Sequence, residues 1–94
     1  MRLVGRKKLT EFQNVHADVG PWVRAWVAEV EAATWQRPLD IKARYPSASV
    51  ISKHVIIFNV KGNKYRLEAH VSYQAQIVSV VRWGTHAEYD KWTW

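Results

Sequence analysis

Hydrophobic positions in the first third of the chain recur every third or fourth residue, which is the spacing of one face of an α-helix. Residues 7–16 carry an apolar side chain at every third position, and residues 21–34 carry a wider apolar stripe that includes Trp22 and Trp26. Pro21 stands at the first position of the second segment, where a helix needs no N–H donor. The pattern predicts helices at 7–16 and 21–34, and we interpret the tryptophan stripe as core packing rather than as a groove for a partner.

The period of the pattern changes to two in the second half of the chain. Residues 54–60 (HVIIFNV) form a nearly continuous apolar run with β-branched residues, as in a buried strand. Residues 65–73 alternate between an apolar and a polar face, and residues 77–83 predict a third strand. Residues 37–53 predict a connection with one helical turn, and residues 1–4 predict a short edge strand.

Helices followed by strands predict an α+β protein. At 94 residues the chain is expected to form one domain over its whole length. We expect the N-terminal helices to pack on one face of a mostly antiparallel sheet of three or four strands, followed by a short C-terminal helix. The other face of the sheet is then available for function.

Turn residues suggest how the strands pair. A two-residue loop at 62–63 places Asn59 opposite Arg66. The same loop places Val55 opposite His70.

A two-residue loop at 74–75 would place Arg66 opposite Trp83, and the indole beside the guanidinium would suit a phosphate flanked by a base. That register sends Arg82 to the opposite face, and a change of one residue in loop length would reverse this. In this register, the polar face of the sheet would carry Asn59, Lys61, Lys64, Arg66, His70 and Trp83.

Charge points to an anionic partner, because 14 Lys and Arg stand against 8 Asp and Glu, for a net charge of +6. Such an excess favours polyanions, nucleic acid among them. The absence of cysteine excludes disulfides, thiolate catalysis and Cys-ligated zinc. No apolar run approaches the ~20 residues of a membrane span, and the basic N-terminus lacks the hydrophobic stretch of a signal peptide. We therefore expect a cytoplasmic protein without membrane contact.

No cofactor is expected. The chain contains no glycine-rich phosphate loop and no dinucleotide-binding motif. Its histidines do not have the spacing of metal ligands, so no metal site is predicted.

The segment 85–88 (THAE) matches a helix-capping box, with Thr85 as N-cap and Glu88 reaching back to it. For these two residues we favour a purely structural role. A helix that begins there places His86, Tyr89 and Asp90 on one face, because they are three and four residues apart.

Metal-free RNA cleavage is a reaction that this set of groups can perform. The ribose 2′-hydroxyl attacks its own phosphodiester, a base takes its proton, and an acid protonates the departing 5′-oxygen. Histidine suits the proton transfers, and Arg66 with a lysine can stabilise the charged phosphorane.

Two stretches, FNVKGNKYRLEAHV and WGTHAEYDKW, resemble the HigB toxins of the RelE/ParE superfamily of bacterial toxin–antitoxin systems. The resemblance extends to the opening RLVGRKKLTEF and to WQRPLDIKARYPSA in the middle. It implies a compact RelE-like fold of the microbial-ribonuclease type.

The resemblance also implies a function. Such a protein is the toxin of a type II system, a metal-independent endoribonuclease (mRNA interferase) that cleaves mRNA on the ribosome, in the 30S A site, and inhibits translation. A HigA-like helix-turn-helix antitoxin would neutralise it. The implied catalytic residues are Arg66, His86 and Tyr89, and the assignment of acid and base is open because it varies in the superfamily. The candidate RNA-binding residues are Lys53, His54, Lys61, Lys64, His70, Arg82, Trp83 and Asp90.

Two alternatives are compatible with the same sequence. One is a ParE-like toxin that targets gyrase without cleaving nucleic acid, although that branch tends to lack the acid–base side chains present here. The other is a basic RNA-binding module, which would bind RNA in a salt-sensitive manner without turnover.

Overall fold

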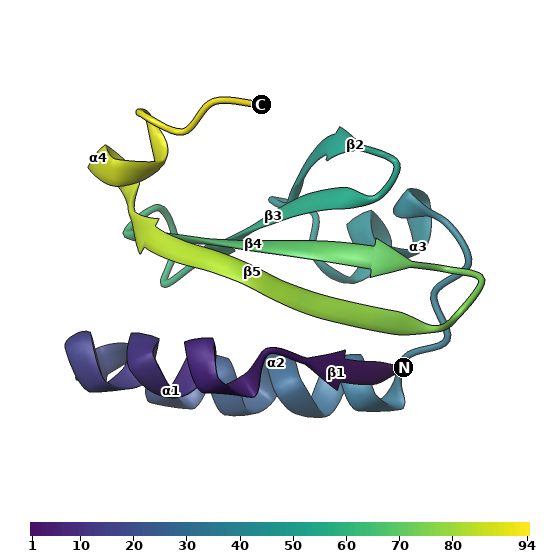
Figure 1. Ribbon diagram of the computed structural model, residues 1–94, viewed down its shortest axis with the longest axis horizontal. Coiled ribbons are helices and arrows are strands. Elements are labelled where there is room, and N and C mark those ends of the chain that lie inside the picture. The colour runs from purple at the N-terminus through teal and green to yellow at the C-terminus, as the bar shows by residue number, and fades with distance from the viewer.

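A computed structural model describes all residues, 1–94, as helices packed against one sheet (Figure 1). None of its helices has the length and apolar character needed to cross a membrane. In chain order the elements are β1 (Arg2–Val4), α1 (Arg6–Val15), a 3-10 helix (Ala17–Val19), α2 (Gly20–Ala32), α3 (Pro38–Arg44), β2 (Ser49–Ser52), β3 (Val55–Val60), β4 (Tyr65–Ser72), β5 (Ile77–Thr85) and α4 (His86–Tyr89).

The sheet has five strands in the order β1-β5-β4-β3-β2, and only the pair β1–β5 is parallel. Helices α1 and α2 lie against one face, whereas α4 and the residues after it lie on the opposite side (Figure 1). The predicted α+β architecture is confirmed. The expected strand count was too low, because part of the segment expected to be a connection forms β2, with Ser49 paired to Ile57.

The core lies between the helices and the sheet. Phe12 of α1 and Trp26 of α2 are fully buried there. The Trp26 ring lies 5.3 Å from the ring of Phe58 in β3, and Trp22 stacks on Trp26 at 6.0 Å. The interpretation of the tryptophan stripe as core packing is therefore confirmed.

The β3–β4 hairpin has the predicted register. Asn59 lies opposite Arg66. Val55 lies opposite His70. Gly62 adopts a φ of 68°, in the left-handed region that glycine enters without a steric penalty. The turn residues alone were sufficient to predict this register, because the pairing continues from the loop without a bulge.

The β4–β5 pairing differs from the prediction in half of its length. Ala69 lies opposite Val80, but past an irregularity the next pair is Glu68 with Arg82, so Val81 is an extra residue in β5. A bulge of this kind reverses the faces of the side chains beyond it. As a result Arg66 lies opposite Gly84, and Arg82 shares the face of Arg66.

The predicted pairing of Arg66 with Trp83 is therefore wrong. The Trp83 indole lies on the helix side of the sheet, stacked on the Phe12 ring with centroids 5.0 Å apart and planes at 10°. The RNA-binding role expected for Trp83 loses its basis, because this ring belongs to the border of the core.

Trp83→Ala should lower the free energy of unfolding by about 2–4 kcal/mol, because it removes a large ring packed on Phe12. Urea unfolding followed by far-UV circular dichroism measures this loss. Trp94→Ala is the matched control, because that ring is 58% exposed and should cost well under half as much. A stable Trp83→Ala protein with impaired RNA binding would contradict the assignment.

Candidate active site

The start of α4 is held by the predicted capping box. The Glu88 backbone N–H donates to Thr85 Oγ1 at 3.2 Å, and the Thr85 backbone N–H donates to Glu88 Oε1 at 2.9 Å. The bond from the Thr85 backbone N–H is the largest cause of the lowered pKa of the Glu88 carboxyl. The His86 backbone N–H donates to the carbonyl of Lys64 at 3.1 Å. This last bond ties α4 to the β3–β4 turn and sets His86 beside β4.

Arg66 of β4 is the centre of the candidate site, and it is only 7% exposed. Its Nη1 donates to the carbonyls of Asn63 at 3.0 Å and Tyr65 at 3.2 Å. Its Nη2 lies 3.0 Å from His86 Nδ1, and its Cζ lies 5.3 Å from the centre of the Tyr89 ring. The anchored guanidinium of Arg66 thus contacts both of the other residues expected to be catalytic.

The contact between Arg66 and His86 defines the state of the imidazole. A guanidinium has donors only, so Nδ1 must accept this bond and therefore carries no proton. The neutral ring then carries its proton on Nε2, which lies 3.7 Å from Asp90 Oδ2. The side chains of His86 and Asp90 are both more than half exposed, so Nε2 is the nitrogen that an incoming group meets.

Glu68 is a buried acid that the sequence analysis did not select. It is 4% exposed, with Oε1 accepting from Arg82 Nε at 2.6 Å and Oε2 lying 2.7 Å from His70 Nε2. Arg66, Glu68 and His70 are every second residue of β4, so their side chains lie on the same face of the sheet. This face points away from α1 and α2, and we name it the open face. The alternation R-x-E-x-H was visible in the sequence, but the pairing of Glu68 with Arg82 depends on the bulge in β5.

A hollow of about 410 Å³ lies at the far end of the open face from α4. Its lining residues are His54, His70, Val71, Ser72, Ala75, Ile77 and Ser79. His54 Nδ1 lies 2.8 Å from the carbonyl of Val71 and must donate to it, because a carbonyl only accepts. The hollow therefore has two imidazoles, those of His54 and His70, on its wall.

Lys64 does not join the group around Arg66. Its Nζ lies 3.0 Å from Asp18 Oδ2, and the Tyr65 hydroxyl donates to the same carboxylate. The hydrogen bond from Lys64 lowers the pKa of Asp18, and the same contact raises the pKa of Lys64. The expectation that Lys64 lies with Arg66 on one face is corrected, because its ammonium group pairs with the 3-10 helix. Lys53 and Lys61 are exposed in turns.

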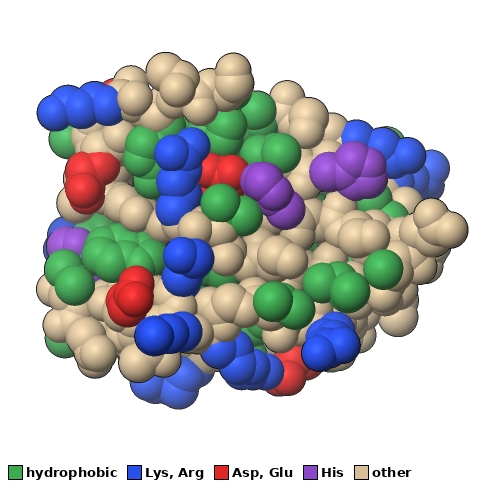
Figure 2. All heavy atoms as spheres, viewed as in Figure 1, with side chains coloured by type: hydrophobic (Ala, Val, Ile, Leu, Met, Phe, Trp, Pro, Cys, Tyr) green, Lys and Arg blue, Asp and Glu red, His purple; other side chains and the backbone are tan.

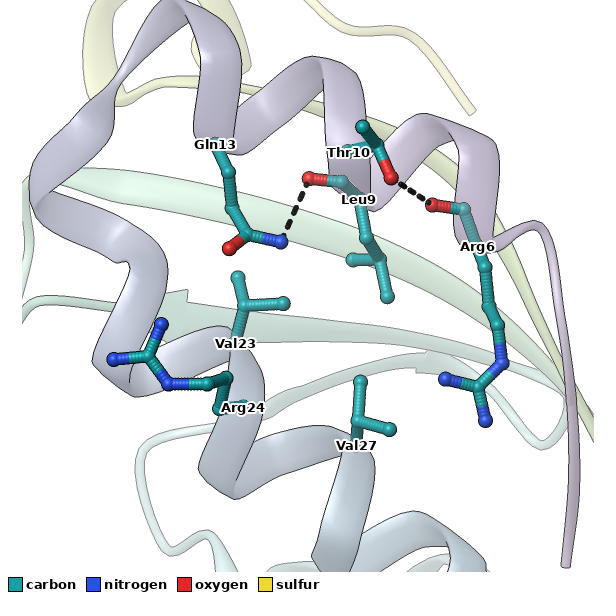
Figure 3. Close-up of a pocket in the computed structure, with 7 residues that line it drawn as sticks. All are labelled: Arg6, Leu9, Thr10, Gln13, Val23, Arg24 and Val27. Atoms are coloured by element: carbon teal, nitrogen blue, oxygen red, sulfur yellow. Dashed lines mark hydrogen bonds between the residues drawn. The ribbon is translucent and has the colours of Figure 1, made fainter.

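A second hollow, of about 300 Å³, lies between α1 and α2 on the other side of the sheet. The guanidinium groups of Arg6 and Arg24 flank it, and Gln13 donates to the carbonyl of Leu9 within it (Figure 3). Lys and Arg side chains gather along this helical side of the molecule (Figure 2). None of the residues expected to be functional lines it, so the candidate chemistry and this hollow are on opposite faces.

The side chains of this protein do not form a set of ligands for a metal ion. No three His, Asp or Glu side chains gather closely enough to hold a metal ion. The groups that can act on a substrate are the guanidinium, imidazole and phenol side chains of the open face.

The chain matches the model of a known protein family. The model of the family described as HigB_toxin, a RelE-like toxic component of a toxin-antitoxin system, matches residues 21–92. The matched segment runs from α2 to just beyond α4 and contains every residue discussed above as catalytic or RNA-binding. No curated protein matches the chain significantly.

Glu68→Ala should lower the free energy of unfolding by about 2–4 kcal/mol, because it leaves the inner ends of Arg82 and His70 without their partner. Chemical unfolding of purified protein measures the loss. Glu29→Ala is the matched control, since it removes an exposed carboxylate paired with Arg44 and should cost far less. Equal losses in the two variants would show that the Glu68 pairs add nothing beyond surface contacts.

Proposed function

The chain belongs to the HigB family of RelE-like toxins of toxin–antitoxin systems, and on that premise we propose that it is a metal-independent endoribonuclease acting on mRNA. We propose further that it cleaves messages in the 30S A site of the ribosome, inhibits translation in the cytoplasm and is neutralised by a HigA-like helix-turn-helix antitoxin. The observation that carries the proposal is the buried Arg66 guanidinium, in contact with His86 at 3.0 Å and with the Tyr89 ring.

Arg66 is suited to stabilise the phosphorane. Two backbone carbonyls fix its Nη1, so the guanidinium is held in position before the substrate arrives. A preorganised cation in a partly dehydrated site stabilises developing charge better than a mobile one does. Cleavage by this route needs the ribose 2′-hydroxyl, so DNA is not a substrate.

We assign His86 the role of proton donor to the 5′-oxygen. A phosphate oxygen that accepts from Arg66 Nη2 competes with His86 Nδ1 for that donor. Once Nδ1 is released, the imidazole can take up a proton and pass one from Nε2 to the leaving oxygen. The 2′-hydroxyl proton goes to solvent, with water as the acceptor. Tyr89 covers the guanidinium and keeps it facing the phosphate.

The RNA strand is proposed to lie along the open face. Arg82 and His70 follow Arg66 along this face, and His54 stands at its far end beside the hollow. The exposed Lys53 and Lys61 add charge in the flanking turns, and Asp90 orients Nε2 of His86. A net charge of +6 favours association with both message and ribosome.

Arg66→Ala should slow cleavage of a short synthetic mRNA programmed into the A site of purified ribosomes by about 10²–10³-fold, because one preorganised donor group is lost. Arg66→Lys keeps the charge but loses the planar fork, so it should recover only a small part of the rate. Quantified cleavage products give the rates, and circular dichroism checks that both variants fold. Full activity in Arg66→Ala would overturn the proposal.

His86→Ala should lose about 10²–10⁴-fold in rate on the same message. A message with sulfur in place of the 5′-oxygen at the cleaved bond needs no protonation of its leaving group. On that message His86→Ala should regain most of the rate. Equal losses on the two messages would remove the role of proton donor from His86.

Induction in cells separates the nuclease from a gyrase-directed toxin. We expect messages to disappear while the chromosome remains intact, and co-expression of the antitoxin to prevent it. DNA breaks with intact messages would instead favour the ParE-like alternative, and neither effect would favour a simple RNA-binding module.

A further inference from the structure

The residues after α4 place two indole rings against Arg82 on the open face. The Arg82 Cζ lies 4.1 Å from the centre of the Trp92 ring and 5.2 Å from the centre of the Trp94 ring. On its other side, the Arg82 Nε donates to the buried carboxylate of Glu68 at 2.6 Å. One guanidinium is therefore held between an anchored acid and two aromatic rings.

The inner ring, Trp92, packs against β5 at Gly84. A Cβ atom on Gly84 would lie 3.0 Å from Trp92 Cζ2, so the indole packs directly on the backbone of β5 where a side chain would obstruct it. Gly84 is the residue opposite Arg66. Trp92 therefore fills the space above the strand and supports the outer ring.

The outer ring, Trp94, is free to meet a ligand. It is 58% exposed, although its neighbours are aromatic and cationic. Its centroid lies 6.4 Å from that of Tyr89, which in turn covers Arg66. An exposed indole thus continues the surface formed by the proposed catalytic residues.

We propose that Trp94 is a stacking site for one nucleobase of single-stranded RNA, next to the phosphate held by Arg66. The identity of the ligand rests on the proposed nuclease function. An exposed aromatic ring in contact with the guanidinium of Arg82, and linked through Tyr89 to that of Arg66, resembles sites that bind single-stranded nucleic acid. In such sites a base stacks on the ring while cations bind the adjacent phosphates. The stacked base sits on the outer side of Trp94, and Arg82 neutralises the neighbouring phosphate.

The family relationship does not assign this role. The family match ends at residue 92, so Trp94 lies beyond it. The position of the stacking site follows from the contacts of this chain. The proposal makes Trp94 a determinant of which nucleotide beside the cleaved bond is held most firmly.

The test measures binding without cleavage. A short RNA with a 2′-O-methyl group at the cleaved position is labelled and titrated with protein by fluorescence anisotropy. Trp94→Ala should weaken binding by about 5- to 150-fold, the range expected for one base stacked on an aromatic ring. Trp94→Phe keeps a ring and should retain most of the affinity. Leu39→Ala, which removes another exposed apolar side chain, should leave affinity unchanged.

A series of RNAs that each lack one base identifies the partner of the ring. Loss of one particular base should weaken binding to the wild-type protein as much as Trp94→Ala does, and should not weaken binding to Trp94→Ala further. Wild-type affinity in Trp94→Ala, or equal losses from every missing base in both proteins, would show that the ring merely covers Arg82 and would overturn the proposal.

The outcomes also separate this site from the nuclease function. Base-specific stacking in a protein that never cleaves RNA would uphold the stacking site and refute the nuclease. Cleavage of ribosome-bound message by the wild-type protein, together with unchanged binding by Trp94→Ala, would refute the stacking site and leave the nuclease standing.

Discussion

The arrangement of the open face depends on one extra residue in β5. Because Val81 has no partner in β4, every side chain of β5 beyond it changes face. Arg82 then meets Glu68, and Trp83 turns to Phe12 under the sheet. In a regular ladder the cation would face the hydrophobic core and the indole would face solvent, and both placements are unfavourable. The bulge therefore places Trp83 against the core and Arg82 on the charged open face at the same time.

Charged groups on this surface are held by partners that the sheet supplies. Arg66 is anchored by two carbonyls of its own hairpin, and Arg82 is anchored by Glu68. Removing a charge from water is costly unless such partners are present. Because of these bonds, both guanidinium groups are held in a fixed direction before a ligand binds. His86 is also held in place, by the capping box at the start of α4 and by one backbone hydrogen bond to the β3–β4 turn.

Aromatic residues serve different ends on the two faces of the sheet. On the helix side, Phe12 and Trp26 are buried and stabilise the fold. On the open face, Trp92 fills the space above Gly84, and Trp94 is left exposed over Arg82. The composition shows only that the chain is rich in tryptophan; the side of the sheet on which each segment packs decides which rings are buried and which are exposed.

Sequence alone determined the features that local chemistry controls. Apolar periodicity located the helices and the three long strands, the turn at Gly62 set the β3–β4 register, and Thr85 with Glu88 defined the start of α4. Only the tertiary structure decided the features that depend on residues far apart in the chain. The pairing of β2, the bulge at Val81 and the contact of Lys64 with Asp18 are set by how strands and helices pack together. A one-residue shift in strand pairing leaves the local pattern almost unchanged but reverses the side-chain faces, so the burial of Glu68 and the position of Arg82 could be seen only in the folded protein.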